Sequence, residues 1–196
     1  LSDERMMEPM RKQNKAAAEE EASRFHSELF DWGEALLISL ATVILIFVFG
    51  VRIIGVQGSS MEPTLQDANQ LLVSNLFYTP QKGDIVILTK DSFMESPIVK
   101  RVIATEGDTV DIDFDTGVVT VNGEVLEEEY IAEPTTTFYD VTFPQTVPEG
   151  CIFVMGDNRN HSTDSRYAAL GMVDTRYVIG KVLMRIYPFN EIGTVS

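Results

Sequence analysis

The sequence predicts a mainly β domain of antiparallel strands behind a single N-terminal transmembrane helix. Three observations predict this fold. An uncharged apolar run occupies residues 35–51. From Leu71 onward, short apolar or alternating segments are separated by Gly, Asp, Asn and Pro, a pattern typical of strands and turns. After the apolar run no stretch has the periodicity of an amphipathic helix, apart from turn-like stretches at 61–67 and 164–170.

Residues 1–33 are polar and charge-mixed, and we expect them to form a disordered or partly helical cytoplasmic tail. The run that follows, ALLISLATVILIFVFGV, has no polar stripe, which disfavours a buried soluble helix. As a helix it spans about 26 Å, slightly less than a hydrocarbon core of about 30 Å. Because Arg52 can snorkel to the interface, we expect the anchor to cover residues 34–56 and the outer domain to cover residues 57–196.

Basic residues near the apolar run predict its orientation. No Lys or Arg lies between Arg52 and Lys82, whereas the preceding tail is rich in them. The positive-inside rule therefore predicts a single-pass protein of the cell membrane, with its N-terminus in the cytoplasm and its domain outside. A cleavable signal peptide is disfavoured, because the preceding polar segment is long and no A-x-A site follows. The basic tail residues are Arg5, Arg11, Lys12, Lys15 and Arg24.

The predicted strands are short. Asn122-Gly123 separates two of them and is a strong signal for a two-residue hairpin turn. Cys151 begins another, and we interpret it as a buried strand thiol. The predicted strand segments are Leu71–Val73, Asp84–Leu88, Pro97–Ala104, Thr109–Phe114, Val118–Val121, Glu124–Leu126, Cys151–Met155 and Tyr177–Tyr187.

The composition disfavours several function classes. A formal net charge of −15, from 30 acidic and 15 basic residues, provides no electrostatic footprint for nucleic acid. The single cysteine cannot form an intramolecular disulfide. With no CxxC motif, and with His26 far from His161 in the sequence, we expect no metal site.

Two residues with catalytic chemistry lie in separate segments. Ser60 lies in GSSMEPTL, where Pro63 restricts the preceding residue and so fixes the chain beside the serine. A serine here is otherwise an ordinary loop residue or helix cap. Lys100 lies in PIVKRVIA, and period-two alternation places it on an apolar face with Ile98 and Val102. Burial on that face would lower the pKa of the amine toward the range of a general base. The alternative is an edge-strand lysine whose amine reaches water.

A serine nucleophile needs a base. Outside the tail only His161 carries an imidazole, and it lies in the polar stretch GDNRNHSTDSR. A solvated side chain explains it more readily, so a Ser-His-Asp triad is the weaker option. The stretch is either a solvated loop or an ion-pair network in which Asp157, Asp164 and Arg166 stiffen a site.

Three motifs in this order, behind one anchor, resemble the type I signal peptidases over roughly residues 35–188. SSMEPTL resembles the nucleophile motif, which implies that Ser60 attacks the substrate. KRVIATEGD is similar to the motif that carries the lysine base, which implies this role for Lys100. GDNRNHSTDSR is similar to the most distinctive family motif. It implies that Ser162 holds the lysine amine, supported by Asp157, Asp164 and Arg166.

The resemblance implies a membrane-bound serine endopeptidase, without a cofactor, that removes A-x-A-like signal peptides from secretory preproteins. Its partners would be these preproteins and membrane lipid, with the secretion translocon a further candidate. An extended substrate is expected to pair with strand edges around Gln57 and residues 97–99. Shallow apolar pockets for small side chains would be lined by Val56, Met61, Leu65, Ile98 and Val99.

The sequence departs from some family members at two places. Gly58 stands where some members have a hydroxyl residue that helps the oxyanion hole, so the hole would rely more on backbone N–H groups, including that of Ser60. The interval from Asp111 to Gly156 is too short for the disulfide-bearing insertion of some Gram-negative members. The chain is therefore more similar to a Gram-positive enzyme.

Two other classes of protein share part of this pattern. Self-cleaving repressors use a Ser-Lys pair on a related β fold, but they are soluble and carry a DNA-binding domain, which the apolar run and the acidic charge disfavour. A non-enzymatic, membrane-tethered β domain would explain the anchor and the strands. It would leave GDNRNHSTDSR without a purpose.

Overall fold

The computed structural model describes residues 28, 30–45, 50–90 and 93–195, and the chain divides into two units, Leu1–Val48 and Phe49–Ser196. In the first unit, residues 30–45 are helical. None of the helices within the described ranges has the length and apolar character needed to span a membrane. Most of the expected tail and residues 46–49 of the expected anchor lie outside the described residues.

The second unit begins with a strand that the sequence analysis assigned to the anchor. β1 (Val51–Gly55) pairs antiparallel with β2 (Gln70–Ser74), so that Val51 lies opposite Ser74. The expected C-terminal end of the anchor at residue 56 is therefore corrected. The segment Val-Arg-Ile-Ile is rich in β-branched residues, which suit a strand, and its backbone groups find their partners in β2.

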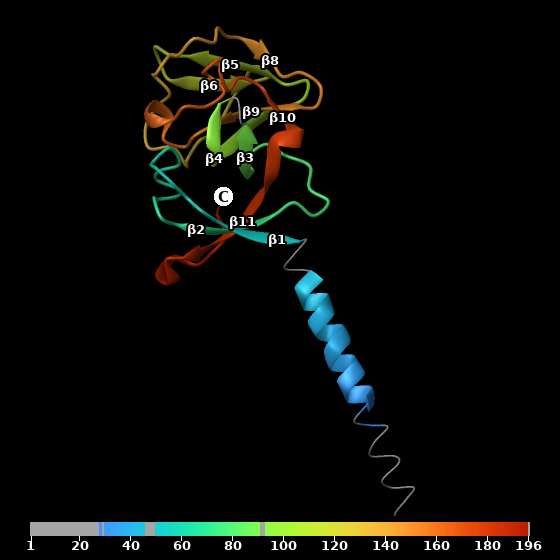
Figure 1. Ribbon diagram of the computed structural model, residues 1–196. Helices are drawn as coiled ribbons and strands as arrows, with labels where there is room; N and C mark the ends of the chain where they lie inside the picture. The colour runs from blue at the N-terminus through green and yellow to red at the C-terminus, as the bar shows by residue number, and fades with distance from the viewer. Residues whose placement is uncertain (1–27, 29, 46–49, 91–92, 196) are drawn as a thin grey trace, which may run out of the picture. The chain divides into compact units, whose positions relative to one another are not determined.

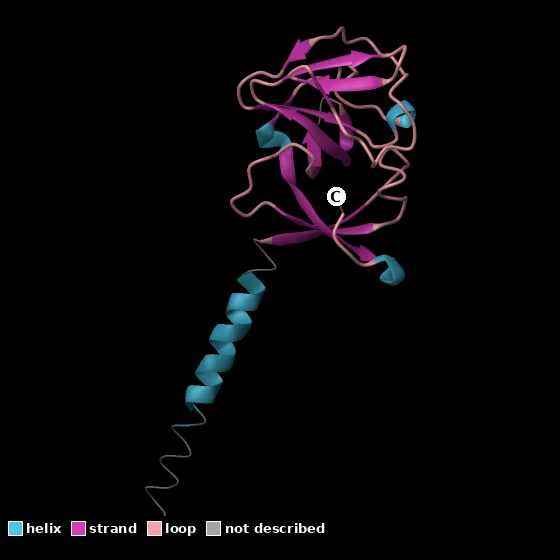
Figure 2. Cartoon of the chain, turned by 180° about the vertical axis from the view of Figure 1, so that it is seen from behind, coloured by secondary structure: helices cyan, strands magenta, loops and turns pink. Residues whose placement is uncertain are grey.

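The described residues of the second unit form two antiparallel sheets (Figures 1 and 2). One has the order β1-β2-β11-β3-β4-β9-β10 and the other the order β7-β6-β5-β8. Figure 1 shows β5, β6 and β8 at the end of this unit opposite to β1 and β2. The prediction of a mainly antiparallel β domain is confirmed. The remaining strands are β3 (Ile85–Lys90), β4 (Met94–Thr105), β5 (Thr109–Asp113), β6 (Val118–Val121), β7 (Glu124–Val125), β8 (Gln145–Thr146), β9 (Cys151–Met155), β10 (Val173–Asp174) and β11 (Val178–Tyr187).

Each predicted strand segment coincides with or overlaps an observed strand, whereas β1, β8 and β10 were not predicted. Asn122 and Gly123 have φ angles of 57° and 80°, as a type I′ turn requires, and join β6 to β7 as predicted. Cys151 is a free, half-buried thiol. Single-turn 3₁₀ helices cover Arg159–His161, Thr175–Tyr177 and Phe189–Glu191.

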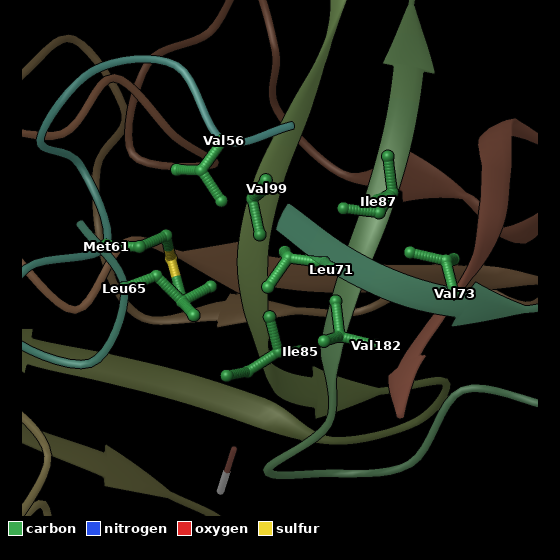
Figure 3. Packing of buried hydrophobic residues seen from close by; sticks show 9 residues of the cluster. All are labelled: Val56, Met61, Leu65, Leu71, Val73, Ile85, Ile87, Val99 and Val182. Carbon is green, nitrogen blue, oxygen red and sulfur yellow. The ribbon is translucent and has the colours of Figure 1, made fainter. Parts of the chain in front are cut away.

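One of the hydrophobic clusters holds the loop between β1 and β2 in place (Figure 3). Val56, Met61 and Leu65 from this loop are 4%, 1% and 0% exposed, and they pack against residues of β2, β3, β4 and β11. Burying side chains of this size stabilises the loop by roughly 1.5–3 kcal/mol each. Ser60 lies between Val56 and Met61 in the sequence, so its backbone is fixed on both sides.

Candidate active site

Lys100 lies on β4, which is an interior strand between β3 and β9. It pairs with Val86 of β3 and is 3% exposed. Its Nζ donates hydrogen bonds to Ser60 Oγ at 2.8 Å and to the Val99 carbonyl oxygen at 2.9 Å. The alternative of an edge-strand lysine with a solvated amine is therefore excluded.

Burial is the main reason why the pKa of Lys100 is lowered, from 10.5 to about 8. The carboxylates of Asp164 and Asp157 act in the opposite direction, while the guanidinium of Arg166 favours the neutral amine. At about pH 7 a lysine with this pKa is neutral in roughly a tenth of the molecules, against roughly one in three thousand for an ordinary lysine. The amine can then accept the proton of the hydroxyl that it contacts.

The serine loop rests on the turn that follows β9. The Asn158 N–H donates to the Ser60 carbonyl oxygen at 3.1 Å, and the Asn158 side-chain amide donates to the Ser59 carbonyl oxygen at 3.0 Å. Gly156 allows this contact, because a Cβ at that position would overlap the Ser60 carbonyl oxygen and the Ser162 side chain. The turn and the serine loop are thus fixed against one another by hydrogen bonds and by a close approach that only glycine permits.

Three buried ion pairs surround this turn, and each guanidinium binds its carboxylate through two nitrogens. The Asp164–Arg166 pair lies inside the predicted polar stretch, with N···O distances of 2.8 and 2.9 Å. Asp157 pairs instead with Arg101, at 2.8 and 2.7 Å. The third pair joins Arg159 to Glu128, at 2.9 and 2.6 Å.

Sequence reasoning missed Arg101, Arg159 and Glu128. Strand alternation gives a signal for Arg101, since a residue next to Lys100 on an interior strand points to the opposite face. Arg159 belongs to the polar stretch but was given no role. Glu128 lies within a run of glutamates, and no local feature separates it from its neighbours.

Ser162 lies beside Gly156 and is 1% exposed, yet its Oγ has no hydrogen-bond partner among the described residues. The expected contact between Ser162 and the Lys100 amine is therefore absent from this structure. The amine instead uses Ser60 Oγ and the Val99 carbonyl oxygen as its acceptors.

A cavity of about 240 Å³ opens over the Ser60–Lys100 pair. Of the predicted substrate-binding residues it includes all but Leu65, which is fully buried in the core beneath the loop. His161 also lines this cavity, but it is Lys100 that contacts Ser60. The predicted substrate-binding residues that line it are Val56, Gln57, Met61, Ile98 and Val99, and other lining residues include Gly58, Ser96, His161 and Thr163.

Gly58 has a φ of +82°, a conformation that side chains rarely adopt. Its N–H donates to Asp67 Oδ1 at 2.8 Å. The Ser60 N–H donates to no acceptor within the described residues. The Ser60 N–H is thus an available backbone donor next to the Ser60 hydroxyl.

A serine hydroxyl in hydrogen-bond contact with a buried lysine of lowered pKa, in an open cavity, is typical of serine hydrolases with a lysine base. Comparison with known proteins identifies the family within this class of enzymes. A family model described as signal peptidase, peptidase S26, matches residues 29–187. The chain belongs to this family, and it is therefore a peptidase.

Individual proteins similar to this chain are also signal peptidases. Signal peptidase I of Bacillus licheniformis is 38% identical over 184 residues, which cover 89% of this chain and 97% of the relative. Signal peptidase I T of Bacillus subtilis is 34% identical over 192 residues, which cover 93% and 97%. A crystal structure of a signal peptidase I from Enterococcus faecalis is 36% identical and covers 53% of this chain and 97% of that chain, with a TM-score of 0.45. The family model and the Bacillus relatives confirm the predicted resemblance to the type I signal peptidases.

Proposed function

We propose that this peptidase removes signal peptides from secreted preproteins outside the cytoplasm, with Ser60 as nucleophile and Lys100 as general base. The observation that carries the proposal is the 2.8 Å contact between Lys100 Nζ and Ser60 Oγ. A nucleophile and its base need this separation for direct proton transfer. The pKa of Lys100, lowered to about 8, also supports the proposal, because it makes the neutral amine accessible.

In the first step the neutral Lys100 amine takes the hydroxyl proton of Ser60 while Oγ attacks the carbonyl carbon of the scissile peptide. The ammonium then gives this proton to the leaving amine, and an ester of Ser60 remains. In the second step the neutral amine takes a proton from water, and the resulting hydroxide attacks the ester. The proton returns to Ser60 Oγ as the C–O bond breaks. The Ser60 N–H is a donor for the oxyanion in both steps.

The substrate is proposed to bind as an added strand. β4 pairs with β3 at Ile98 and Val99, whereas β9 pairs with β4 only from Arg101 to Thr105. Residues 97–99 therefore offer one free strand edge beside the cavity, which supports β-addition. The half-buried or buried apolar side chains that line the cavity leave room for small residues, as an A-x-A-like sequence provides.

The proposed anchor begins at residue 34 and now ends before β1. Its uncharged run, residues 35–50, would span about 24 Å as a helix, and the bilayer adapts to spans slightly shorter than its core. Exposed apolar side chains in β1 and in the segments that follow β2 and β11, three strands adjacent in the sheet, support lipid as a partner. They are Ile53, Leu76, Phe77, Phe189 and Ile192. Protease added to intact, right-side-out spheroplasts tests the orientation. The catalytic domain is expected to be degraded, and a protected domain would contradict the proposed orientation.

The test of the chemistry is cleavage of a preprotein with an A-x-A site by the full chain in detergent. Ser60→Ala and Lys100→Ala are each expected to abolish cleavage. Ser59→Ala is the matched control, because it removes the adjacent hydroxyl, and it is expected to retain activity. Full cleavage by Ser60→Ala or by Lys100→Ala would show that the assignment is wrong.

A further inference from the structure

The segment between β7 and β8 places two side chains on the arginines of the site. Glu128 binds Arg159 through both carboxylate oxygens and is 7% exposed at its side chain. The Tyr130 ring lies over the Arg101 guanidinium at 3.9 Å and faces that of Arg159 at 5.8 Å. The Tyr130 hydroxyl donates to Glu128 Oε1 at 3.2 Å. Glu128 and Tyr130 therefore act together on two different ion pairs.

One line of contacts runs from Glu128 to the nucleophile. Arg159 is fully buried, and an unpaired guanidinium there would carry a large desolvation cost, so Glu128 fixes its position. Arg159 Nε donates to the Gly156 carbonyl oxygen at 3.0 Å. Gly156 in turn packs against the Ser60 carbonyl oxygen. These contacts connect Glu128 to the Ser60 backbone through two residues, Arg159 and Gly156.

A second line runs from Tyr130 to the base. The Tyr130 ring covers Arg101 from one side, while Arg101 holds Asp157 with two hydrogen bonds and the Gly83 carbonyl oxygen with a third. Burial lowers the pKa of Lys100, and Asp157 opposes this effect. The Arg101 guanidinium compensates the charge of Asp157, so a hydrated or displaced Arg101 would favour the protonated form of Lys100.

We propose that Glu128 and Tyr130 are positioning residues for the cleavage reaction, acting through Arg159 and Arg101 to fix the Gly156 turn and to keep the charge of Asp157 compensated. This inference rests on the proposed Ser60–Lys100 mechanism. Neither residue is among those that line the cavity, so neither is expected to contact the substrate at the bond that is cut. Their effect is therefore on the rate and its pH dependence and not on substrate affinity.

The test compares three variants of the full chain in detergent by the pH profile of kcat/KM for a preprotein. Tyr130→Leu opens Arg101 to water. The rise of kcat/KM with pH is then expected to occur about one pH unit higher than in the unmodified chain, so that kcat/KM at a pH below this rise falls about tenfold. Tyr130→Phe keeps the ring and is expected to retain the profile. Glu129→Gln, an exposed neighbour, is the charge control and is expected to be unchanged. The other ionisable groups around Lys100, namely Asp157, Asp164, Arg166 and His161, are the same in all three variants.

An unshifted ascending limb in a folded Tyr130→Leu protein would overturn the inference. If Tyr130→Leu fails to fold, Glu128→Gln takes its place, because this substitution retains the shape of the side chain. The kcat of Glu128→Gln is expected to fall several-fold with KM unchanged. An unchanged kcat in that variant would equally overturn it. Failure of the proposed function has a different signature, because Ser60→Ala would then cleave as the unmodified chain does.

Discussion

Replacing Lys100 with methionine is expected to abolish cleavage and to stabilise the β domain at neutral pH. The pKa of Lys100 is about 8 where an ordinary lysine has 10.5, and each pH unit of difference is worth about 1.4 kcal/mol. Burial therefore disfavours the protonated amine by about 3 kcal/mol. Methionine has a stem of similar length and no charge, so this cost disappears in the variant.

The hydrogen bonds that Lys100 makes oppose this gain. Their loss costs about 1 kcal/mol in total, since Ser60 Oγ lies on an open cavity where water replaces the amine. The net effect expected at about pH 7 is a stabilisation of about 2 kcal/mol. Urea denaturation of the full chain in mild detergent, followed by circular dichroism, measures it. Lys82→Met, at a half-exposed lysine paired with Asp108, is the control and is expected to change stability by less than about 0.5 kcal/mol.

The pH dependence provides the sharper test. Below about pH 8 Lys100 is protonated in both the folded and the unfolded chain, so the burial cost is fully present. Between about 8 and 10.5 the unfolded chain binds more protons than the folded one, and the stability of the unmodified protein rises with pH. The advantage of Lys100→Met should therefore shrink and vanish over this interval. An equal advantage at about pH 7 and at about pH 10, or a destabilisation at both, would refute the reasoning.

Three further outcomes are expected. The cleavage rate should rise with pH up to about 8, the pKa of the lysine base, because only the neutral amine accepts a proton; a flat profile over the neutral range would contradict this. Asp157→Asn leaves the Arg101 guanidinium buried without a counter-charge and should lower the free energy of unfolding by about 3–5 kcal/mol, as measured in urea. Gly156→Ala should abolish cleavage, because the added Cβ overlaps the Ser60 carbonyl oxygen, whereas Gly193→Ala meets open space and should retain it.

Most of the fold could be predicted, because its signals are local. Alternating apolar segments and the Asn122-Gly123 turn specify strands within a few residues. β1 was missed for a physical reason. Val51–Gly55 continues the apolar run and is itself apolar apart from Arg52, and a short stretch of β-branched residues fits either the end of an apolar helix or a strand. Only pairing with β2 decides between them, and this pairing depends on residues some twenty positions further along.

The site likewise contains residues that local sequence patterns predict and residues that they do not. Strand alternation placed Lys100 on an apolar face, and the segment around Ser60 could be identified by its motif. Glu128 could not be found, because it lies between two other glutamates and differs from them only in facing Arg159 in the folded chain. Its identity as part of the site is a property of the tertiary structure, and no local pattern carries it.

Two of the three ion pairs explain how the pKa of Lys100 stays low beside two carboxylates. Buried ion pairs are weak evidence for stability, since apolar residues of similar volume often stabilise a core as well or better. Their value here is electrostatic. Asp157 and Asp164 both favour the protonated form of Lys100, and unpaired carboxylates at these positions would move its pKa back toward that of an ordinary lysine. Each is bound instead by a guanidinium, Arg101 or Arg166, so the turn gains rigid polar contacts while burial continues to dominate the pKa of the base.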